Sequence, residues 1–89
     1  MTSLTLPPVL DLAAASPLRA TLLASRGQDL ELDASAVTRI GGQCVQVLLA
    51  AQRTWRADGK RFVLRNQSDP CRETLALMQA DKLLGVEDV

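Results

Sequence analysis

The spacing of apolar residues along the chain predicts three strands that alternate with three helices. Polar and apolar residues alternate over residues 3–6 and again over residues 29–33, which is typical of half-buried strands. Residues 61–65 form a short apolar run between two arginines and indicate a buried strand. Alternation of this kind favours an α/β sandwich, and we expect its last two crossovers to be parallel and right-handed.

Helical spacing and end signals place the first two helices. The first covers about residues 12–26, with Asp11 or Ser16 as its N-cap and Gly27 in the left-handed position after its end. The second covers about residues 42–57 and has the strongest helical pattern of the chain. The apolar face of the first helix consists of Leu18, Leu22 and Leu23. The apolar stripe of the second consists of Cys44, Val47, Leu48, Ala51 and Trp55, widened by Val45 and Leu49.

A third helix begins near residue 69, where Asp69 is the expected N-cap and Pro70 the first helical residue. Its expected buried face consists of Cys71, Leu75 and Met78. A short final turn is expected to contain Leu83, Leu84 and Val86, and residues 87–88 are expected to fray. Residues 9–10 favour further extended structure, whereas residues 34–40 read as a connection.

Length and composition indicate one folded domain with no net charge. The chain has 89 residues, of which 47% are hydrophobic and 22% charged, and 10 basic residues balance 10 acidic ones. A chain this short folds around a single core, so we expect one domain over residues 1–89. A neutral chain whose only aromatic residues are Trp55 and Phe62 lacks the charge and the stacking surfaces of a nucleic-acid-binding protein.

The residue types that are missing exclude several kinds of site. Without histidine, the chain has no Ser-His-Asp or Cys-His nucleophile and no imidazole metal ligand. Cys44 and Cys71 lie on apolar stripes and are interpreted as core residues rather than zinc ligands or redox thiols. We therefore expect no metal, no cofactor and no enzymatic activity. The chain shows neither a signal sequence nor a membrane-spanning apolar run, so we expect a cytoplasmic protein with reduced thiols.

Residues 33–49 resemble the central segment of STAS domains, the family of bacterial anti-sigma factor antagonists and sulfate-transporter tails. Asp33, Ser35 and Val37 match the end of a strand in that family. The residues that match the helix after it are Val45, Val47, Leu48 and Leu49. With the patterns on either side, the resemblance covers residues 2–84. It implies a STAS-type sandwich, with a small mixed or parallel sheet of about four strands and three to four helices.

The chain departs from the family pattern at the start of this helix. STAS domains carry Asp-Ser-Ser-Gly there, and in the switched members a partner kinase phosphorylates a serine or threonine of this motif. Gly42 and Gln43 occupy those positions and have no hydroxyl group. The resemblance therefore implies that the phosphorylation switch is missing at its usual place. Ser35 and Thr38 are the nearest hydroxyls, and loop hydrogen bonding is their ordinary role.

The docking surface of the family, at the loop and the exposed side of the helix, is what remains. Gln43 and Gln46 present uncharged amides that tolerate burial at an interface better than charges do, and Arg39 and Arg53 would flank them. Gly41-Gly42 is either a tight turn or an anion-binding helix N-terminus. The expected partner-binding residues are Arg39, Gly41, Gly42, Gln43, Gln46, Ala50 and Arg53.

The Gly41-Gly42-Gln43-Cys44 start resembles that of the small STAS proteins of bacterial chemotaxis gene clusters. That resemblance implies a signalling partner, either a chemotaxis-type histidine kinase or its response regulator. The alternatives are the STAS subunit of a lipid-transport ABC ATPase complex and an anti-sigma factor antagonist; the latter would need phosphorylation of Ser35 or Thr38. A homodimer through an exposed sheet edge or a weakly covered sheet face also stays open.

Basic residues are concentrated in the middle of the chain. Residues 39–65 carry six of them against Asp58 alone, whereas the segments before and after are net acidic. Either these charges are solvated and balanced elsewhere in the fold, or they form a patch that docks an acidic partner. Trp55 is likewise open to two interpretations, a core residue or a half-exposed contact for a partner.

Overall fold

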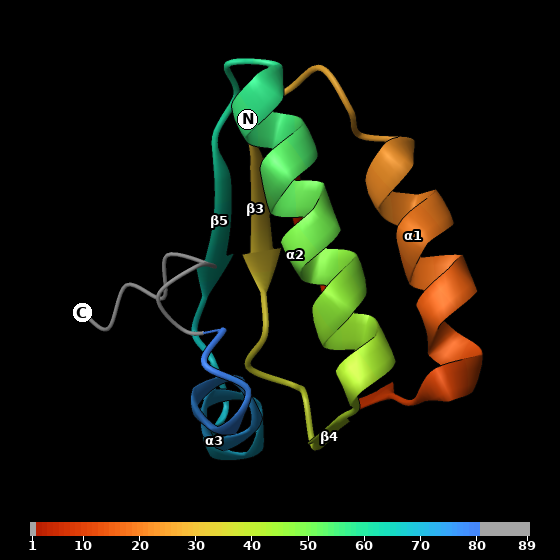
Figure 1. Cartoon of the computed structure of the whole chain (residues 1–89), viewed down its shortest axis with the longest axis vertical. Coiled ribbons are helices and arrows are strands. Elements are labelled where there is room, and N and C mark those ends of the chain that lie inside the picture. Colours follow the sequence, from red (N-terminus) through yellow and green to blue (C-terminus); the bar gives the residue numbers. More distant parts are fainter. Residues whose placement is uncertain (1, 81–89) are drawn as a thin grey trace.

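Strands and helices alternate along the chain, as the sequence predicts (Figure 1). The computed structural model describes residues 2–80. Its elements in chain order are β1 (Thr2–Thr5), β2 (Val9–Leu10), the 3₁₀ turn η1 (Leu12–Ala14), α1 (Ala15–Leu23), β3 (Leu30–Asp33), β4 (Arg39–Ile40), α2 (Gly42–Ala57), β5 (Phe62–Arg65) and α3 (Asp69–Leu77).

The strands form two small parallel sheets. The larger has the order β1-β3-β5, with Leu4, Leu32 and Leu64 side by side in register. The smaller pairs β2 with β4, so that Val9 lies opposite Arg39. The predicted α/β class is therefore confirmed. In place of one sheet of about four strands, the described residues form a three-stranded sheet and a separate two-stranded sheet. The expectation of a plain connection over residues 34–40 is wrong at its end, because β4 gains its strand geometry only by pairing with β2.

The two faces of the larger sheet differ. Figure 1 shows α1 and α2 side by side across one face, and α3 at the end of the strands. Leu30 and Leu32 point to the helical face and are fully buried. On the other face Ser3 is exposed, and Glu31 forms an ion pair with Arg65 at 3.1 Å. One face thus builds the core, whereas the other carries the Glu31–Arg65 ion pair and exposed Ser3 beside the buried Val63.

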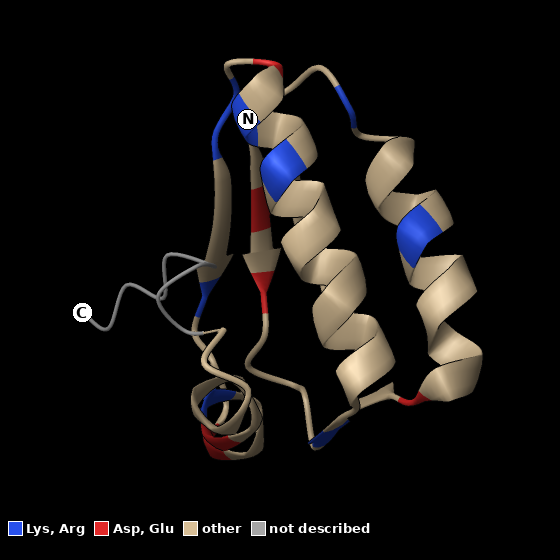
Figure 2. Cartoon of the chain, in the orientation of Figure 1, with Lys and Arg blue, Asp and Glu red and all other residues tan. Residues whose placement is uncertain are grey.

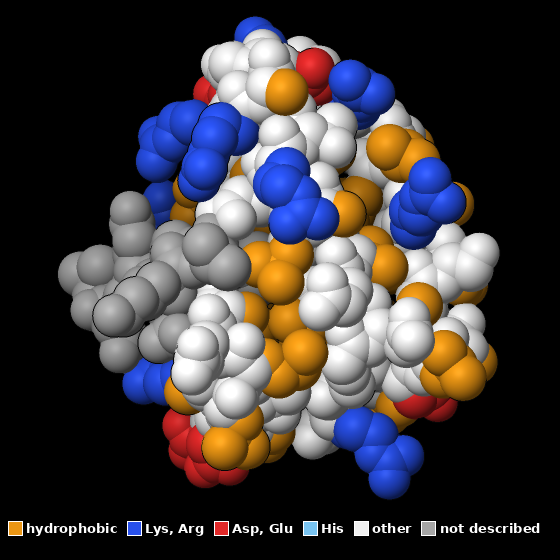
Figure 3. Space-filling model, in the orientation of Figure 1, with side chains coloured by type: hydrophobic (Ala, Val, Ile, Leu, Met, Phe, Trp, Pro, Cys, Tyr) orange, Lys and Arg blue, Asp and Glu red, His pale blue; other side chains and the backbone are white. Residues whose placement is uncertain are grey.

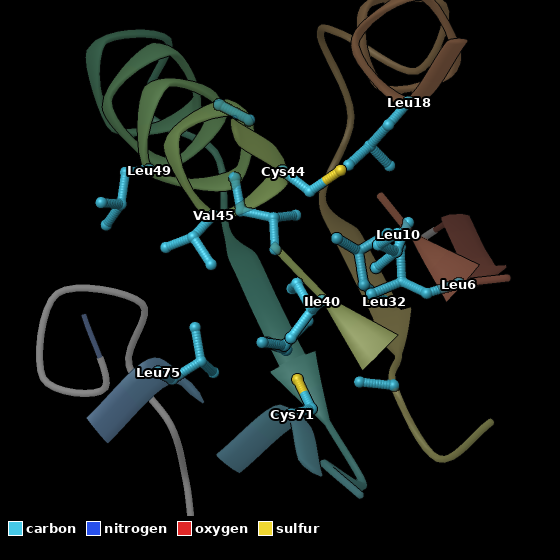
Figure 4. Close-up of a cluster of buried hydrophobic side chains, with 14 of the residues drawn as sticks. Leu6, Leu10, Leu18, Leu32, Ile40, Cys44, Val45, Leu49, Cys71 and Leu75 are labelled. Carbon is cyan, nitrogen blue, oxygen red and sulfur yellow. The ribbon is translucent and has the colours of Figure 1, made fainter. Parts of the chain in front are cut away.

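The core lies between the helices and the larger sheet, and α3 closes its lower end (Figure 4). Trp55 is fully buried, its ring centroid lies 5.5 Å from that of Phe62, and its Nε1 donates a hydrogen bond to the Gln28 carbonyl at 2.8 Å. The interpretation of Trp55 as a core residue is therefore confirmed. The largest other side chains that are fully buried are Leu10, Leu22, Leu30, Leu32, Leu48, Leu64 and Leu75.

The first helix is shorter than the sequence predicts. Its start is the turn η1, capped by Asp11, whose carboxylate accepts a hydrogen bond from the Ala14 N–H at 3.1 Å. Asp11 is therefore the cap, and Ser16 lies inside α1. Residues 24–27 form turns instead of helix, and Gly27 has the expected positive φ of 95°. Leu23 is 45% exposed, so it does not belong to the buried face.

The start of α3 corrects the expected cap. Ser68, not Asp69, is the N-cap, because its Oγ accepts a hydrogen bond from the Cys71 N–H at 3.3 Å. The same hydroxyl donates to the Val37 carbonyl, which ties α3 to the loop after β3. Met78 follows the last residue of the helix and is 38% exposed, so it is not part of the buried face. The predictions for residues 83–88 lie outside the described residues.

Candidate functional site

The start of α2 carries two glycines and Gln43 where the resembling family has its phosphorylated motif. Gly41 is the N-cap, with an extended conformation (φ −102°) that any residue adopts, and its N–H donates to the Leu10 carbonyl at 2.9 Å. A Cβ on Gly42 would lie 3.6 Å from the Met78 side chain, an ordinary contact. Gly41 and Gly42 therefore lie in the loop-to-helix turn, but neither has a positive φ or a close contact at its Cβ position that would demand glycine.

The predicted partner-binding residues divide into two groups. Arg39, Gly41 and Gly42 lie where β4 meets the start of α2. The other four lie along α2 at spacings of three and four and face away from the core. All four are exposed, and we call them the outward stripe: Gln43, Gln46, Ala50 and Arg53. The structure thus brings the four residues of the outward stripe together on one side of α2. The other three lie at the N-terminal end of this helix.

A groove lies between α1 and α2, next to the outward stripe, and encloses about 300 Å³. Gln43, Gln46 and Ala50 line it from α2, and Arg19 and Leu23 line it from α1. Sequence reasoning missed the two residues of α1. One signal was present, since Arg19 and Leu23 are four apart and therefore lie on the same side of a helix.

The hydroxyls nearest to the missing phosphorylation motif take part in the loops around them. The Thr38 hydroxyl donates to the Pro8 carbonyl at 3.1 Å. The Ser35 N–H donates to the Asp33 carboxylate at 2.9 Å. Hydrogen bonds from the Ser35 side chain and then from its N–H lower the pKa of Asp33. Both residues therefore have the local structural role that loop hydroxyls usually have.

The two thiols belong to the core. Cys44 is fully buried, and its Sγ donates to the Asp11 carbonyl at 3.3 Å. Burial, and then the negative charge of Asp11, raise the pKa of Cys44, and burial alone raises that of Cys71. A raised thiol pKa disfavours the reactive thiolate. In the described part of the chain, no group of three or more Cys, Asp or Glu side chains is arranged to hold a metal ion.

The basic residues of the middle segment do not gather in a single patch (Figure 2). Arg65 lies on the polar sheet face in its ion pair with Glu31, and Arg39 lies in β4. Arg53 and Arg56 lie on α2. Asp58, at the end of α2, forms an ion pair with Arg26 at 2.9 Å, and this hydrogen bond lowers the pKa of the Asp58 carboxyl.

Comparison with known families decides what kind of domain this is. Residues 2–85 match the family model described as Mlab, STAS domain. The chain belongs to the STAS family. The resemblance stated from residues 33–49 is therefore confirmed, whereas the link of this STAS domain to chemotaxis gene clusters stays a prediction. No curated protein gives a significant match to the chain. Over residues 2–80, no helix is both long and apolar enough to cross a membrane.

Proposed function

We propose that this STAS domain is a non-enzymatic accessory module that binds a signalling protein through the outward stripe and the adjoining Gly41-Gly42 loop. One observation carries the proposal. The outward stripe is exposed, and none of its side chains forms a hydrogen bond or ion pair with another described residue. Removing its two glutamines and one alanine from water at an interface costs less free energy than removing a lysine or a glutamate.

Binding by this surface would be controlled by occupancy and not by phosphorylation. Gly42 and Gln43 stand at the family's phosphorylated positions without a hydroxyl, and Ser35 and Thr38 make structural contacts in their loops. This arrangement supports a constitutive docking face more than it supports an anti-sigma factor antagonist, whose release depends on a phosphoryl group. The proposed partner is a chemotaxis-type histidine kinase or its response regulator.

The alternative partner is the ATPase subunit of a lipid-transport complex, which a STAS subunit would engage through the same helix. Affinity capture from lysate of the source cells separates the two. Wild-type protein and the Gln46→Glu variant are used as bait, and bound proteins are identified by mass spectrometry. A histidine kinase or response regulator lost from the variant supports the signalling role. A transport ATPase lost from the variant supports the alternative.

The control for Gln46→Glu is Ser3→Glu, which adds the same charge on the polar sheet face. Both sites are exposed, so we expect each substitution to change the free energy of unfolding by less than about 0.5 kcal/mol. The proposal requires capture to fall with Gln46→Glu and to persist with Ser3→Glu. Equal capture by wild type and Gln46→Glu would show that the outward stripe is not the docking face.

A further inference from the structure

The groove between α1 and α2 leaves apolar surface in contact with water. Leu23 of α1 is 45% exposed, and Val47 of α2 is half-buried beside it in the groove. Figure 3 shows hydrophobic side chains in the hollow between the two helices. Contact with an apolar side chain of another molecule would remove this surface from water and is favourable in proportion to the area covered.

The two helices that form the groove carry arginines and no acidic residue. Arg19 lines the groove from α1, and Arg53 lies on α2 one turn beyond Ala50. Neither forms an ion pair with another described residue, whereas Arg26 and Arg65 each do. Figure 3 shows basic side chains on both helices around the hydrophobic hollow. Within residues 2–80, the two arginine charges of this face therefore have no ion-pair partner.

None of the acidic residues of the described part lines the groove. Asp11 lies just before α1 as the cap of η1, and Asp29 accepts a hydrogen bond from the Arg61 N–H. Glu31 and Asp33 belong to β3, and Glu31 is paired on the polar sheet face. Asp58 is paired with Arg26, and Asp69 and Glu73 belong to α3. A chain without net charge thus presents a basic helical face (Figure 2). Such a face attracts a surface of opposite charge and selects against a basic one.

We propose that the groove binds an acidic segment of the partner protein. Apolar side chains of the segment enter the groove against Leu23, Val47 and Ala50, and its carboxylates pair with Arg19 and Arg53. Carboxylates suit arginine because the guanidinium donates two parallel hydrogen bonds to them. The inference rests on the proposed function and deepens it, since it specifies the partner's chemistry and adds α1 to the docking surface.

Other occupants fit the groove less well. A second copy docked face to face would bring two basic faces together, and like charges would oppose it. An anionic membrane is bound by apolar side chains that project outward, whereas Leu23 borders a hollow. A nucleic acid would find no exposed aromatic surface here, because Trp55 lies fully buried beneath the groove.

The test is a selection of random linear peptides displayed on phage, carried out on wild-type protein and on the double variant Arg19→Glu/Arg53→Glu. We expect the wild type to enrich peptides in which Asp or Glu alternates with large apolar residues. Their affinity should fall about tenfold or more on the double variant. Peptides with lysine in place of the acidic residues should show the opposite preference. A matched control is Lys60→Glu/Arg61→Glu, which changes the net charge equally outside the groove and should retain binding.

Four results would overturn the inference. The first is enrichment of peptides without acidic residues, or of none at all. The second is equal binding of acidic peptides to wild type and double variant. The third is cosedimentation of wild type, but not the double variant, with phosphatidylglycerol vesicles in the absence of acidic peptide ligands. The fourth is capture of the partner that is lost with Gln46→Glu but kept in full with Arg19→Glu/Arg53→Glu. The proposed function then stands and this inference fails. Should the double variant not fold, Arg19→Gln/Arg53→Gln provides the same comparison.

Discussion

The two sides of α2 belong to one helix, but their side chains differ in exposure and in the contacts that they make. On the inward side Cys44, Val45, Leu48 and Trp55 are all at 0% exposure, packed against the larger sheet and α1. The outward stripe is exposed along the helix, and its side chains form no hydrogen bond or ion pair with another described residue. The same helix therefore offers one side to the core and keeps the other free for a partner.

This difference means that stability and binding should respond to different substitutions. A change on the inward side should lower the free energy of unfolding, and it should affect binding only through the fraction of folded protein. A change on the outward stripe should weaken binding and leave the free energy of unfolding almost unchanged. Four substitutions in α2 or at its ends test whether stability and binding depend on different sides of the helix.

The largest expected effect follows Leu48→Ala. Leu48 is fully buried, so the substitution removes apolar contact and leaves a cavity, at a cost of about 2–5 kcal/mol. Urea denaturation followed by circular dichroism measures the loss. Under conditions where the variant is folded, partner capture should match that of wild type. Strong loss of capture by fully folded Leu48→Ala would show that the two sides are coupled.

A smaller loss is expected from Trp55→Phe. The substitution keeps an aromatic ring near Phe62 but removes the Nε1–H that donates to the Gln28 carbonyl. A carbonyl left without its donor, together with the smaller ring, should cost about 1–3 kcal/mol. The midpoint of urea denaturation reports this change. An unchanged midpoint would mean that the indole hydrogen bond contributes nothing to the free energy of unfolding.

Gly42→Ala should have an effect of opposite sign. Alanine is favoured over glycine in a helix by roughly 0.5–1 kcal/mol, and the new Cβ would meet the Met78 side chain at an ordinary distance. We expect a small rise in melting temperature. If the loop contributes to docking, the added methyl should weaken capture at the same time. A clear fall in melting temperature would contradict the conclusion that the fold does not need this glycine.

The smallest effect should come from Asp58→Asn. In the folded chain the hydrogen bond from Arg26 lowers the pKa of Asp58 below its ordinary value of 3.8. The pair therefore stabilises the fold at pH values above that ordinary pKa, and this contribution is lost as the pH falls through the lower folded pKa. Both side chains are partly exposed, so the effect is small. Thermal melts should show wild type slightly above the variant at neutral pH, with the gap closing in acid. A gap that persists in acid would argue against the ion pair as its source.

The strongest sequence pattern predicted its element best. The bounds of α2 agree with the expected residues 42–57, because its periodicity is long and both ends carry turn signals. The β4 strand was not predictable, since its two residues have no period of their own and pair with Val9-Leu10 far back in the chain. The cap of α3 was misplaced by one residue because Ser68 and Asp69 are both good caps. The serine takes the capping hydrogen bond from the Cys71 N–H and also donates to the Val37 carbonyl, a tertiary contact that the sequence does not show.

The outward stripe followed from helical spacing, but the groove did not. Its second wall depends on how α1 packs against α2, which no local pattern specifies. The sequence placed Leu23 on the apolar face of the first helix, yet Leu22 takes the buried position and turns Leu23 toward the groove. The basic segment over residues 39–65 likewise did not predict the basic face of the two helices. Arg19 on α1 belongs to that face but lies outside the segment, whereas Arg65 belongs to the segment but lies on the polar sheet face.

The most direct test of the central claim is a chemical-shift map of the backbone amides, recorded on ¹⁵N-labelled protein before and after addition of the captured partner. If the partner binds the outward stripe, the largest chemical-shift changes fall on Gln43, Gln46 and Ala50. Further changes are expected at Arg19 and Leu23 across the groove. If the largest changes fall instead on Ser3, Thr5 and Glu31, the partner binds the polar sheet face, and the assignment of the outward stripe is wrong.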